Sequence, residues 1–229
     1  MPTLFVTGTD TGCGKTHVSC ALLKALRQAG EDAVGYKPVA AGCEGTPSGL
    51  RNEDALALQS HSNGAEDYAA INPVALAPPV APHLAAARAG VTIDPGRLVA
   101  GAEALAARHD WVIVEGAGGF LVPLGADTDF ADLVGRAHWP VLLVVGMRLG
   151  CLNHALLTVE AIARRGRLAG WVANALPPRQ DWLEENIATL RDRIAAPCLG
   201  VVAPDSSIDT AALALDLSAL RLRKIHPSG

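Results

Sequence analysis

The stretch "FVTGTDTGCGKT", residues 5–16, joins an apolar run of strand length to a segment of helical period that begins near Lys15. A strand, a Gly-rich loop, Gly-Lys-Thr and a helix, in that order, make up a phosphate-binding loop, in which backbone N–H groups and the helix dipole face an anion. Five residues separate Gly8 from Gly14, one more than the Walker A pattern G-x-x-x-x-G-K-[ST] allows. The stretch predicts a nucleotide-binding loop with an additional residue; the alternative is a Gly-rich turn that binds nothing.

Apolar runs of strand length alternate with longer stretches of helical period along the rest of the chain. Continuous runs such as 111–114 and 141–145 suit strands that are covered on both faces, as in parallel sheets. The alternation predicts an α/β fold, a parallel sheet with helices on both faces. The predicted strands are 3–7, 33–37, 111–115, 140–146, 169–174 and 199–202, and the predicted helices are 15–29, 53–60, 96–108, 153–165, 182–194 and 210–217.

The length and the weaker regions of the chain bear on its domain organisation. A chain of 229 residues fits one domain, residues 1–229, better than two. Residues 61–95 are rich in Ala, Pro and Gly, so a loop region with short helical pieces is expected there. Residues 221–229, which end in "RKIHPSG", are expected to form a frayed tail.

Charge and cysteine content exclude several classes of protein. A formal net charge of -4 disfavours a nucleic-acid partner, which would require a basic excess. No apolar stretch has the length of a signal peptide or a membrane span, so we expect a cytoplasmic protein with no membrane partner. The cysteines lack any C-x-x-C pair, which indicates free thiols in a reducing compartment. They are Cys13, Cys20, Cys43, Cys151 and Cys198.

Two segments supply candidate ligands for a metal–nucleotide complex. Within the Gly-Lys-Thr sequence, Lys15 is expected to reach the β- and γ-phosphates and the Thr16 hydroxyl to ligate Mg²⁺. In "VIVEGAGG", Glu115 stands at the carboxyl end of a buried strand, where phosphate-loop proteins place a second magnesium ligand or contact. A buried glutamate is costly unless it is paired or metal-bound, so the alternative for Glu115 is an ion pair with a nearby lysine.

Two further charged residues are expected at the same edge of the sheet. In "GYKPVAAG", Lys37 ends the second predicted strand, and ligands of open α/β sheets bind beyond the carboxyl ends of strands. Lys37 is therefore expected beside Lys15 with an anion between them. In "LRNEDALAL", Asp54 lies near the start of a helix. It is either a further ligand or a charge that interacts favourably with the helix dipole.

Taken together, six segments resemble the dethiobiotin synthetase family, the ATP-dependent carboxylases of biotin synthesis. They are "FVTGTDTGCGKT", "GYKPVAAG", "LRNEDALALQ", "VEGAGG", "PVLLVVGMRLGCLNHALLT" and "LAGWVAN", in register from about residue 4 to 204. The longer phosphate loop is the family's own form. The resemblance implies a parallel sheet of the P-loop NTPase type, a homodimer, Mg²⁺ as cofactor, and carboxylation of 7,8-diaminononanoate (7,8-diaminopelargonate) with CO₂ and ATP to dethiobiotin. It also implies a carbamate and a carbamic-phosphoric anhydride as intermediates.

The resemblance also implies roles for individual residues. Catalysis would depend on Lys37, Lys15 and Thr11, and Mg²⁺ would be held by Thr16, Asp54 and Glu115. Asn174 would recognise the adenine edge, and residues 203–205 would cover the base. The nucleotide-binding set is Gly12, Cys13, Gly14, Lys15, Thr16, His17, Asp54, Glu115, Gly116, Ala117, Gly118, Asn174, Ala175, Ala203, Pro204 and Asp205. The substrate-binding set is Thr11, Gly12, Lys37, Ala41, Gly118, Leu149, Gly150, Cys151 and Asn153, of which residues 149–153 would bind the substrate carboxylate of the neighbouring subunit.

Three positions depart from the family pattern, and two other functions compete with it. Ala41 replaces a frequent serine, Gly12 a frequent acidic residue and Ala175 a frequent aspartate. One alternative is an amide-forming enzyme of the cobyrinate synthase type, which would need a glutamine-hydrolysing domain as well. The other is an ATPase switch of the ParA or MinD type, which carries a lysine early in the loop, where this chain has Thr9 and Asp10.

Overall fold

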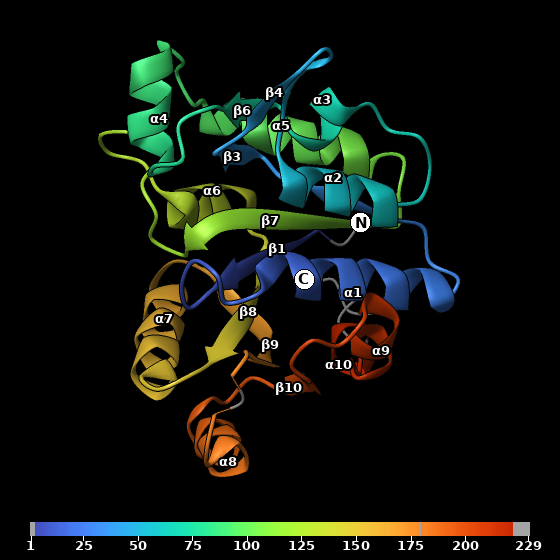
Figure 1. Cartoon of the computed structure of the whole chain (residues 1–229), viewed down its shortest axis with the longest axis vertical. Helices are drawn as coiled ribbons and strands as arrows, with labels where there is room; N and C mark the ends of the chain where they lie inside the picture. Colours follow the sequence, from blue (N-terminus) through green and yellow to red (C-terminus); the bar gives the residue numbers. More distant parts are fainter. Residues whose placement is uncertain (1–2, 179, 222–229) are drawn as a thin grey trace.

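The computed structural model describes residues 3–178 and 180–221. Its main sheet has six strands: β1 (Thr3–Gly8), β2 (Ala33–Tyr36), β7 (Trp111–Gly119), β8 (Pro140–Met147), β9 (Arg167–Ala175) and β10 (Cys198–Val202). Their order is β10-β9-β8-β1-β7-β2, and every pairing is parallel (Figure 1). Each predicted strand is present, and the predicted α/β fold is confirmed.

Helices cover both faces of this sheet. One face carries α1 (Lys15–Gln28), α2 (Glu53–His61), α9 (Ile208–Leu213) and α10 (Ser218–Arg221). The opposite face carries α5 (Pro95–Ala106), α6 (Phe130–Ala137), α7 (Cys151–Arg165) and α8 (Leu183–Arg193). Successive side chains of a strand point to opposite faces, and accordingly Leu4 and Val6 belong to one core cluster whereas Phe5 belongs to the other.

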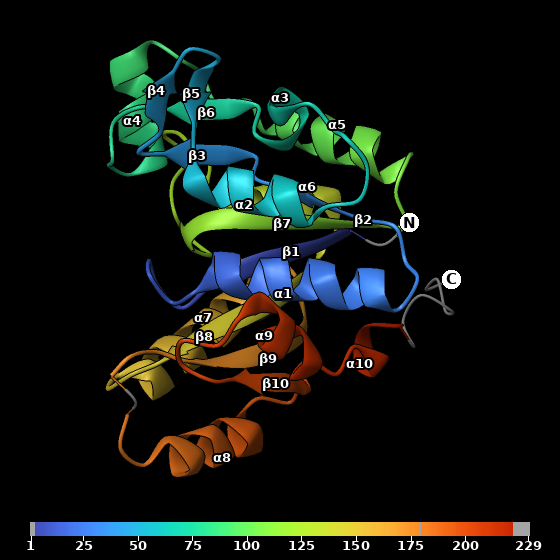
Figure 2. The same cartoon turned by 45° about the vertical axis from the view of Figure 1, so that its right-hand side comes forward.

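Residues 39–51 and 68–89, from the chain between β2 and β7, form a separate unit, the roof, beside the β2 edge of the sheet (Figure 2). It contains a parallel pair, β3 (Val39–Ala41) with β6 (Val74–Leu76), and a hairpin, β4 (Glu44–Thr46) with β5 (Gly49–Arg51). It also contains the helices α3 (Tyr68–Ile71) and α4 (Pro82–Ala89). Within residues 61–95 the short helices were expected, but the prediction missed β6, because a strand of three residues is too short to show a period.

Several predicted boundaries were wrong, among them two near the carboxyl end of the chain. The last predicted helix, 210–217, is α9, which starts at Ile208 and ends at Leu213. It starts early because the Ser207 side chain accepts a hydrogen bond from the Thr210 N–H at 3.2 Å and so caps the helix. The predicted tail began one residue too soon, since Arg221 lies in α10. Residues 222–229 lie outside the described residues.

All five cysteines are free, as predicted. Cys20 is buried in α1, and burial, together with Glu115 and Asp54, raises the pKa of its thiol to about 12. Among residues 3–178 and 180–221, no helix combines the length and the apolar character needed to cross a membrane.

The packing of α1 on the sheet predicts a stability effect. Leu22, a residue of this helix, is fully buried. Leu22→Ala should therefore lower the free energy of unfolding by about 2–5 kcal/mol. Leu213→Ala is the matched control, because 80% of that leucine is exposed; its effect should stay within about 0.5 kcal/mol. Urea titration of both variants measures the difference, and equal effects would contradict the packing described here.

Candidate functional site

The candidate site is a cleft of about 830 Å³ at the carboxyl end of the main sheet. The phosphate loop, the residue after β2, the end of β7 and the roof all contribute to it. Its lining is Thr11, Gly12, Gly14, Lys15, Thr16, Lys37, Ala40, Ala41, Asn52, Glu53, Asp54, Pro79, Val80, Ala81, Pro82, Ala117, Gly118 and Val122. The structure therefore brings Thr11, the Gly-Lys-Thr sequence, Lys37 and Asp54 together, as the sequence predicted.

The phosphate loop depends on glycine at two positions. Gly12 and Gly14 have φ angles of 73° and 86°, in the left-handed region that favours glycine. Gly14 is also covered by Asn174, whose Nδ2 would lie 2.1 Å from any Cβ at position 14. Gly14 is the N-cap of α1, and it has no side chain that could cap the first turn. The N–H groups of that turn are available to an anion.

Asn174 supports the backbone of the phosphate loop. Its Nδ2 donates to the carbonyl of Cys13 at 2.9 Å, and the side chain is almost completely buried. Asn174 was predicted to lie near the nucleotide, but its contact with the loop backbone was not predicted. No sequence signal distinguishes an asparagine that contacts a base from one that supports a loop.

Strand register places Lys37 beside Glu115. Tyr36 pairs with Val114 in the β2–β7 ladder. The residues that follow them, Lys37 and Glu115, are therefore neighbours. Lys37 Nζ donates to Glu115 Oε1 at 2.6 Å and to Asp54 Oδ2 at 3.0 Å. Thr16 Oγ1 also donates to Glu115 Oε1, at 2.9 Å. The structure thus contains the lysine ion pair that was the alternative for Glu115.

The carboxylates set the charge state of this cluster. Burial alone would lower the pKa of Lys37, but Glu115 and Asp54 outweigh it and raise that pKa. Burial would likewise raise the pKa of Asp54, and Lys37 outweighs it and lowers that pKa. Lys37 is therefore an ammonium ion near neutral pH and Asp54 a carboxylate.

The same residues fit a hard divalent cation. A hydroxyl and two carboxylates are oxygen donors of the kind that Mg²⁺ takes. Glu115 is completely buried, and its Oε2 has no hydrogen-bond partner among the described residues. A buried unsatisfied carboxylate oxygen is costly, and a cation bound there would remove that cost.

The second lysine approaches from the phosphate loop. Lys15 is buried, and its Nζ donates to the carbonyl of Asp10 at 3.1 Å. Asp10 also accepts from the Thr11 N–H at 2.7 Å and forms an ion pair with Arg148 in the segment after β8. This ion pair was not predicted, because the sequence does not show that Arg148 reaches the loop.

A chain of hydrogen bonds in the roof, buried where it reaches the Lys37 carbonyl, holds Lys37 in place. Asn72 Nδ2 donates to the carbonyl of Lys37 at 2.6 Å, and the Tyr68 hydroxyl donates to Asn72 Oδ1 at 3.0 Å. The same hydroxyl accepts from the Asn52 N–H at 2.8 Å, and Asn52 caps α2, the helix of Asp54. The sequence "LRNED" contains the cap signal before that helix, but nothing in the sequence connected Tyr68 or Asn72 with Lys37.

The expected base-binding residues lie near the amino end of α1. His17 Nε2 lies 3.4 Å from Ser206 Oγ, so the turn that follows β10 lies beside this helix. Ala203, Pro204 and Asp205 precede Ser206 in that turn and are partly or fully exposed. Ala175 is buried at the end of β9. Ser206 itself was missed, because hydroxyl residues are common in any surface turn.

Four predicted substrate residues are absent from the lining of the cleft: Leu149, Gly150, Cys151 and Asn153. The helix that was predicted to start at 153 starts at Cys151, so Cys151 and Asn153 lie in the first turn of α7. The Cys151 side chain is buried, whereas 94% of Leu149 is exposed. The site of a single chain is thus built without these residues.

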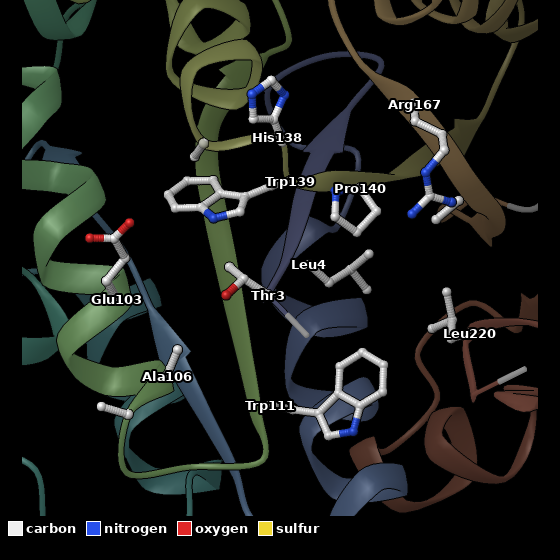
Figure 3. A pocket seen from close by; sticks show the side chains of 13 residues that line it. Thr3, Leu4, Glu103, Ala106, Trp111, His138, Trp139, Pro140, Arg167 and Leu220 are labelled. Carbon is white, nitrogen blue, oxygen red and sulfur yellow. The ribbon is translucent and has the colours of Figure 1, made fainter. Parts of the chain in front are cut away.

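A second cavity lies at the opposite, amino end of the strands (Figure 3). Its volume is about 580 Å³, and Trp111, Trp139 and Arg167 are among its lining residues. Neither lysine of the cleft nor the phosphate loop contributes to it, so it is separate from the candidate site.

Curated relatives match nearly the whole chain. The protein named ATP-dependent dethiobiotin synthetase BioD of Xanthomonas oryzae pv. oryzae is 52% identical over 219 residues, which cover 94% of this chain and 98% of that protein. The protein of the same name from Aromatoleum aromaticum is 54% identical, with 93% and 95% covered. That of Pseudomonas aeruginosa is 52% identical, with 96% and 98% covered.

Solved structures and a family model agree on the fold. MinD of Aquifex aeolicus has a TM-score of 0.55 at 16% identity and covers 100% of this chain and 99% of that one. A ParA family ATPase of Chlorobium tepidum has a TM-score of 0.53 at 12% identity, with 98% and 94% covered. At such identities the likeness shows a shared P-loop NTPase fold and nothing more. A family model described as an AAA domain matches residues 2–212. With relatives above half identity along almost its full length, the chain belongs to the ATP-dependent dethiobiotin synthetase family.

Proposed function

We propose that this protein carboxylates 7,8-diaminononanoate with CO₂ and ATP and closes the product to dethiobiotin. The observation that carries the proposal is the cluster of Lys37, Asp54 and Glu115, which adjoins the phosphate loop in one cleft. The names of the relatives supply the reaction class. A nucleoside triphosphate bound to the loop would place its γ-phosphate between Lys15 and Lys37.

The proposed reaction has three steps. One amine of the substrate attacks CO₂ and loses a proton, which gives a carbamate. A carbamate oxygen attacks the γ-phosphorus of ATP, the bond to the β–γ bridging oxygen breaks, and ADP leaves with that electron pair. The second amine attacks the carbonyl of the resulting carbamic-phosphoric anhydride, expels phosphate, and loses a proton as the cyclic urea closes.

The residues of the cleft would bind and neutralise negative charge. Phosphoryl transfer depends on positioning and on charge stabilisation more than on covalent help. Lys15 would bind the β- and γ-phosphates, and Lys37 would bind the moving phosphoryl group and the carbamate. Thr16, Asp54 and Glu115 would hold Mg²⁺, which supplies further positive charge to the phosphates when it is bound. Thr11 and Gly12 lie in the widened part of the loop, where they would contact the carbamate.

The roof fits the rest of the substrate. Ala40 and Ala41 of β3, together with Pro79, Val80 and Val122, give one side of the cleft an apolar lining. An aliphatic chain such as that of the diamine is favoured on such a surface. The methyl group of Ala41 cannot donate the hydrogen bond that a serine would supply, so binding here would depend more on apolar contact.

The base and the substrate carboxylate complete the proposal. Asn174, Ala175 and the turn 203–205 would surround adenine, while Asn174 also supports the loop through Cys13. The first turn of α7 would bind the carboxylate of a substrate held by a second copy of the chain. Leu157, which is 58% exposed, follows Asn153 by four residues, on the same face of α7. Exposed leucines around an anion-binding helix terminus suit a homodimer interface.

An ATPase switch of the MinD or ParA type is the main alternative, since those proteins share the fold. The decisive measurement is the release of ADP by the purified protein. Under the proposal, ADP release requires both diaminononanoate and bicarbonate, and dethiobiotin forms in equal amount. ATP turnover that is independent of the diamine would refute the proposed function.

Substitution of the two lysines should separate their roles. Lys15→Ala should reduce kcat by about 10²–10³-fold because it removes positive charge from the phosphates. Lys37→Ala should lose activity to a similar degree yet still bind ATP, because Lys37 is assigned to the transferring group. Calorimetry with ATP and steady-state assays of both variants test this. Near-normal turnover in Lys37→Ala would show that the assignment is wrong.

The proposed dimer predicts complementation between inactive variants. Asn153→Asp should repel the substrate carboxylate and inactivate its own homodimer, and Lys37→Ala should inactivate its own for a different reason. Since each site would combine Lys37 of one chain with Asn153 of the other, a mixed dimer has one site with both lesions and one with neither. Random pairing should restore about a quarter of the sites. Verified heterodimers without activity would show that each site lies within one chain.

A further inference from the structure

Lys37 contacts both carboxylates of the proposed metal site. Its Nζ is 2.6 Å from Glu115 Oε1 and 3.0 Å from Asp54 Oδ2, so it bridges both carboxylates. The lysine side chain is 4% exposed and that of Glu115 is 0% exposed. Lys37 also donates to the carbonyl of Gly116 at 3.2 Å, which completes the contacts of the ammonium group.

The negative charge of Asp54 and Glu115 is too small to compensate both Lys37 and a divalent cation. Asp54 and Glu115 together supply two negative charges, of which Lys37 neutralises one. A divalent cation added to these two carboxylates would leave a net positive charge beside the fully buried Glu115, where the surroundings screen charge less than bulk solvent does.

We infer that Lys37 is a built-in competitor of the divalent cation, and that binding of the cation releases Lys37 toward the phosphates. In the nucleotide-free protein the ammonium group compensates Asp54 and Glu115. When the cation takes these carboxylates, Lys37 must find another anion, and within the cleft that anion is the triphosphate. The lysine would then reach the transferring group only once metal and nucleotide are both bound.

This exchange would make the charge that Lys37 supplies to the γ-phosphate depend on the bound metal. Lys37 cannot stabilise charge on the γ-phosphate while it pairs with Glu115, so a nucleotide without metal meets an incomplete site. The roof holds the Lys37 backbone through Asn72, and the long side chain alone would move between its two positions. The inference deepens the proposed function, on which it rests for the identity of the metal ligands.

Binding of Mn²⁺ to the nucleotide-free protein tests the competition. Mn²⁺ prefers the same oxygen ligands as Mg²⁺, and the electron paramagnetic resonance signal of the free ion reports its concentration. Lys37→Met removes the competing charge and keeps most of the side-chain volume. Its affinity for Mn²⁺ should exceed that of the wild type by about tenfold or more, given the strength of charge interactions at such short distances.

Two matched controls localise the effect. Lys15→Met removes the same charge from the same cleft, but Lys15 donates to the Asp10 carbonyl and to neither carboxylate in the described part of the chain. Its gain in affinity should be clearly smaller. Adding Asp54→Asn to Lys37→Met should abolish the gain, because the cation then loses a ligand. Equal gains in both lysine variants, or no gain in Lys37→Met, would overturn the inference.

A second measurement covers the case in which Lys37→Met folds poorly. Loss of one partner of a buried pair leaves an uncompensated charge and destabilises the fold. Millimolar Mn²⁺ should therefore raise the melting temperature of Lys37→Met markedly and that of the wild type little. A melting temperature of Lys37→Met that does not respond to Mn²⁺ would count against the inference. These assays contain no ATP or diamine, so their failure is distinct from a failure of the proposed reaction.

Discussion

The buried carboxylate of Glu115 is the constraint on which the rest of the site depends. It lies on β7, between β1 and the edge strand β2, completely shielded from water, and an ionised group in such a place must be compensated. Its partners come from three elements: Thr16 from α1, Lys37 from the end of β2, and through Lys37 also Asp54 from α2. Breaking a buried pair of this kind typically costs about 3–5 kcal/mol. One side chain thereby links the phosphate loop, the end of β2 and α2.

Much of this arrangement can be predicted from the sequence, because it follows from strand direction. Parallel strands end at one edge, so residues at or after their carboxyl ends are brought together whatever separates them along the chain. Lys37 and Glu115 are 78 residues apart and form an ion pair for this reason. Glycines in the loop and a continuous apolar run in β7 were equally clear signals, since both reflect local sterics and burial.

The contacts that the sequence did not predict depend on side chains from segments without a period. The strands β3 and β6 have three residues each, too few to alternate visibly. Asn72 and Tyr68 are polar residues in a region rich in Ala and Pro, and only the folded chain brings them to the Lys37 carbonyl. The contact of Asn174 with Cys13 spans 161 residues. Such hydrogen bonds satisfy buried polar groups. The sequence shows which residues are polar, but it does not show which groups they will bond to.

The position of the roof, between β2 and β7, has a consequence for how such an enzyme can change during evolution. Under the proposed function, the groups that would face the phosphates belong to the main sheet and its adjoining helices, whereas Pro79 and Val80, which also line the cleft, belong to the roof. Residues 79–82 could then change to suit substrates of another length or shape while the chemistry next to the loop stays the same. Tyr68 and Asn72 cannot drift in this way, since they hold Lys37 from within the same segment. Within this one segment of the chain, some residues would therefore determine which substrate the protein accepts, and others would determine whether it reacts.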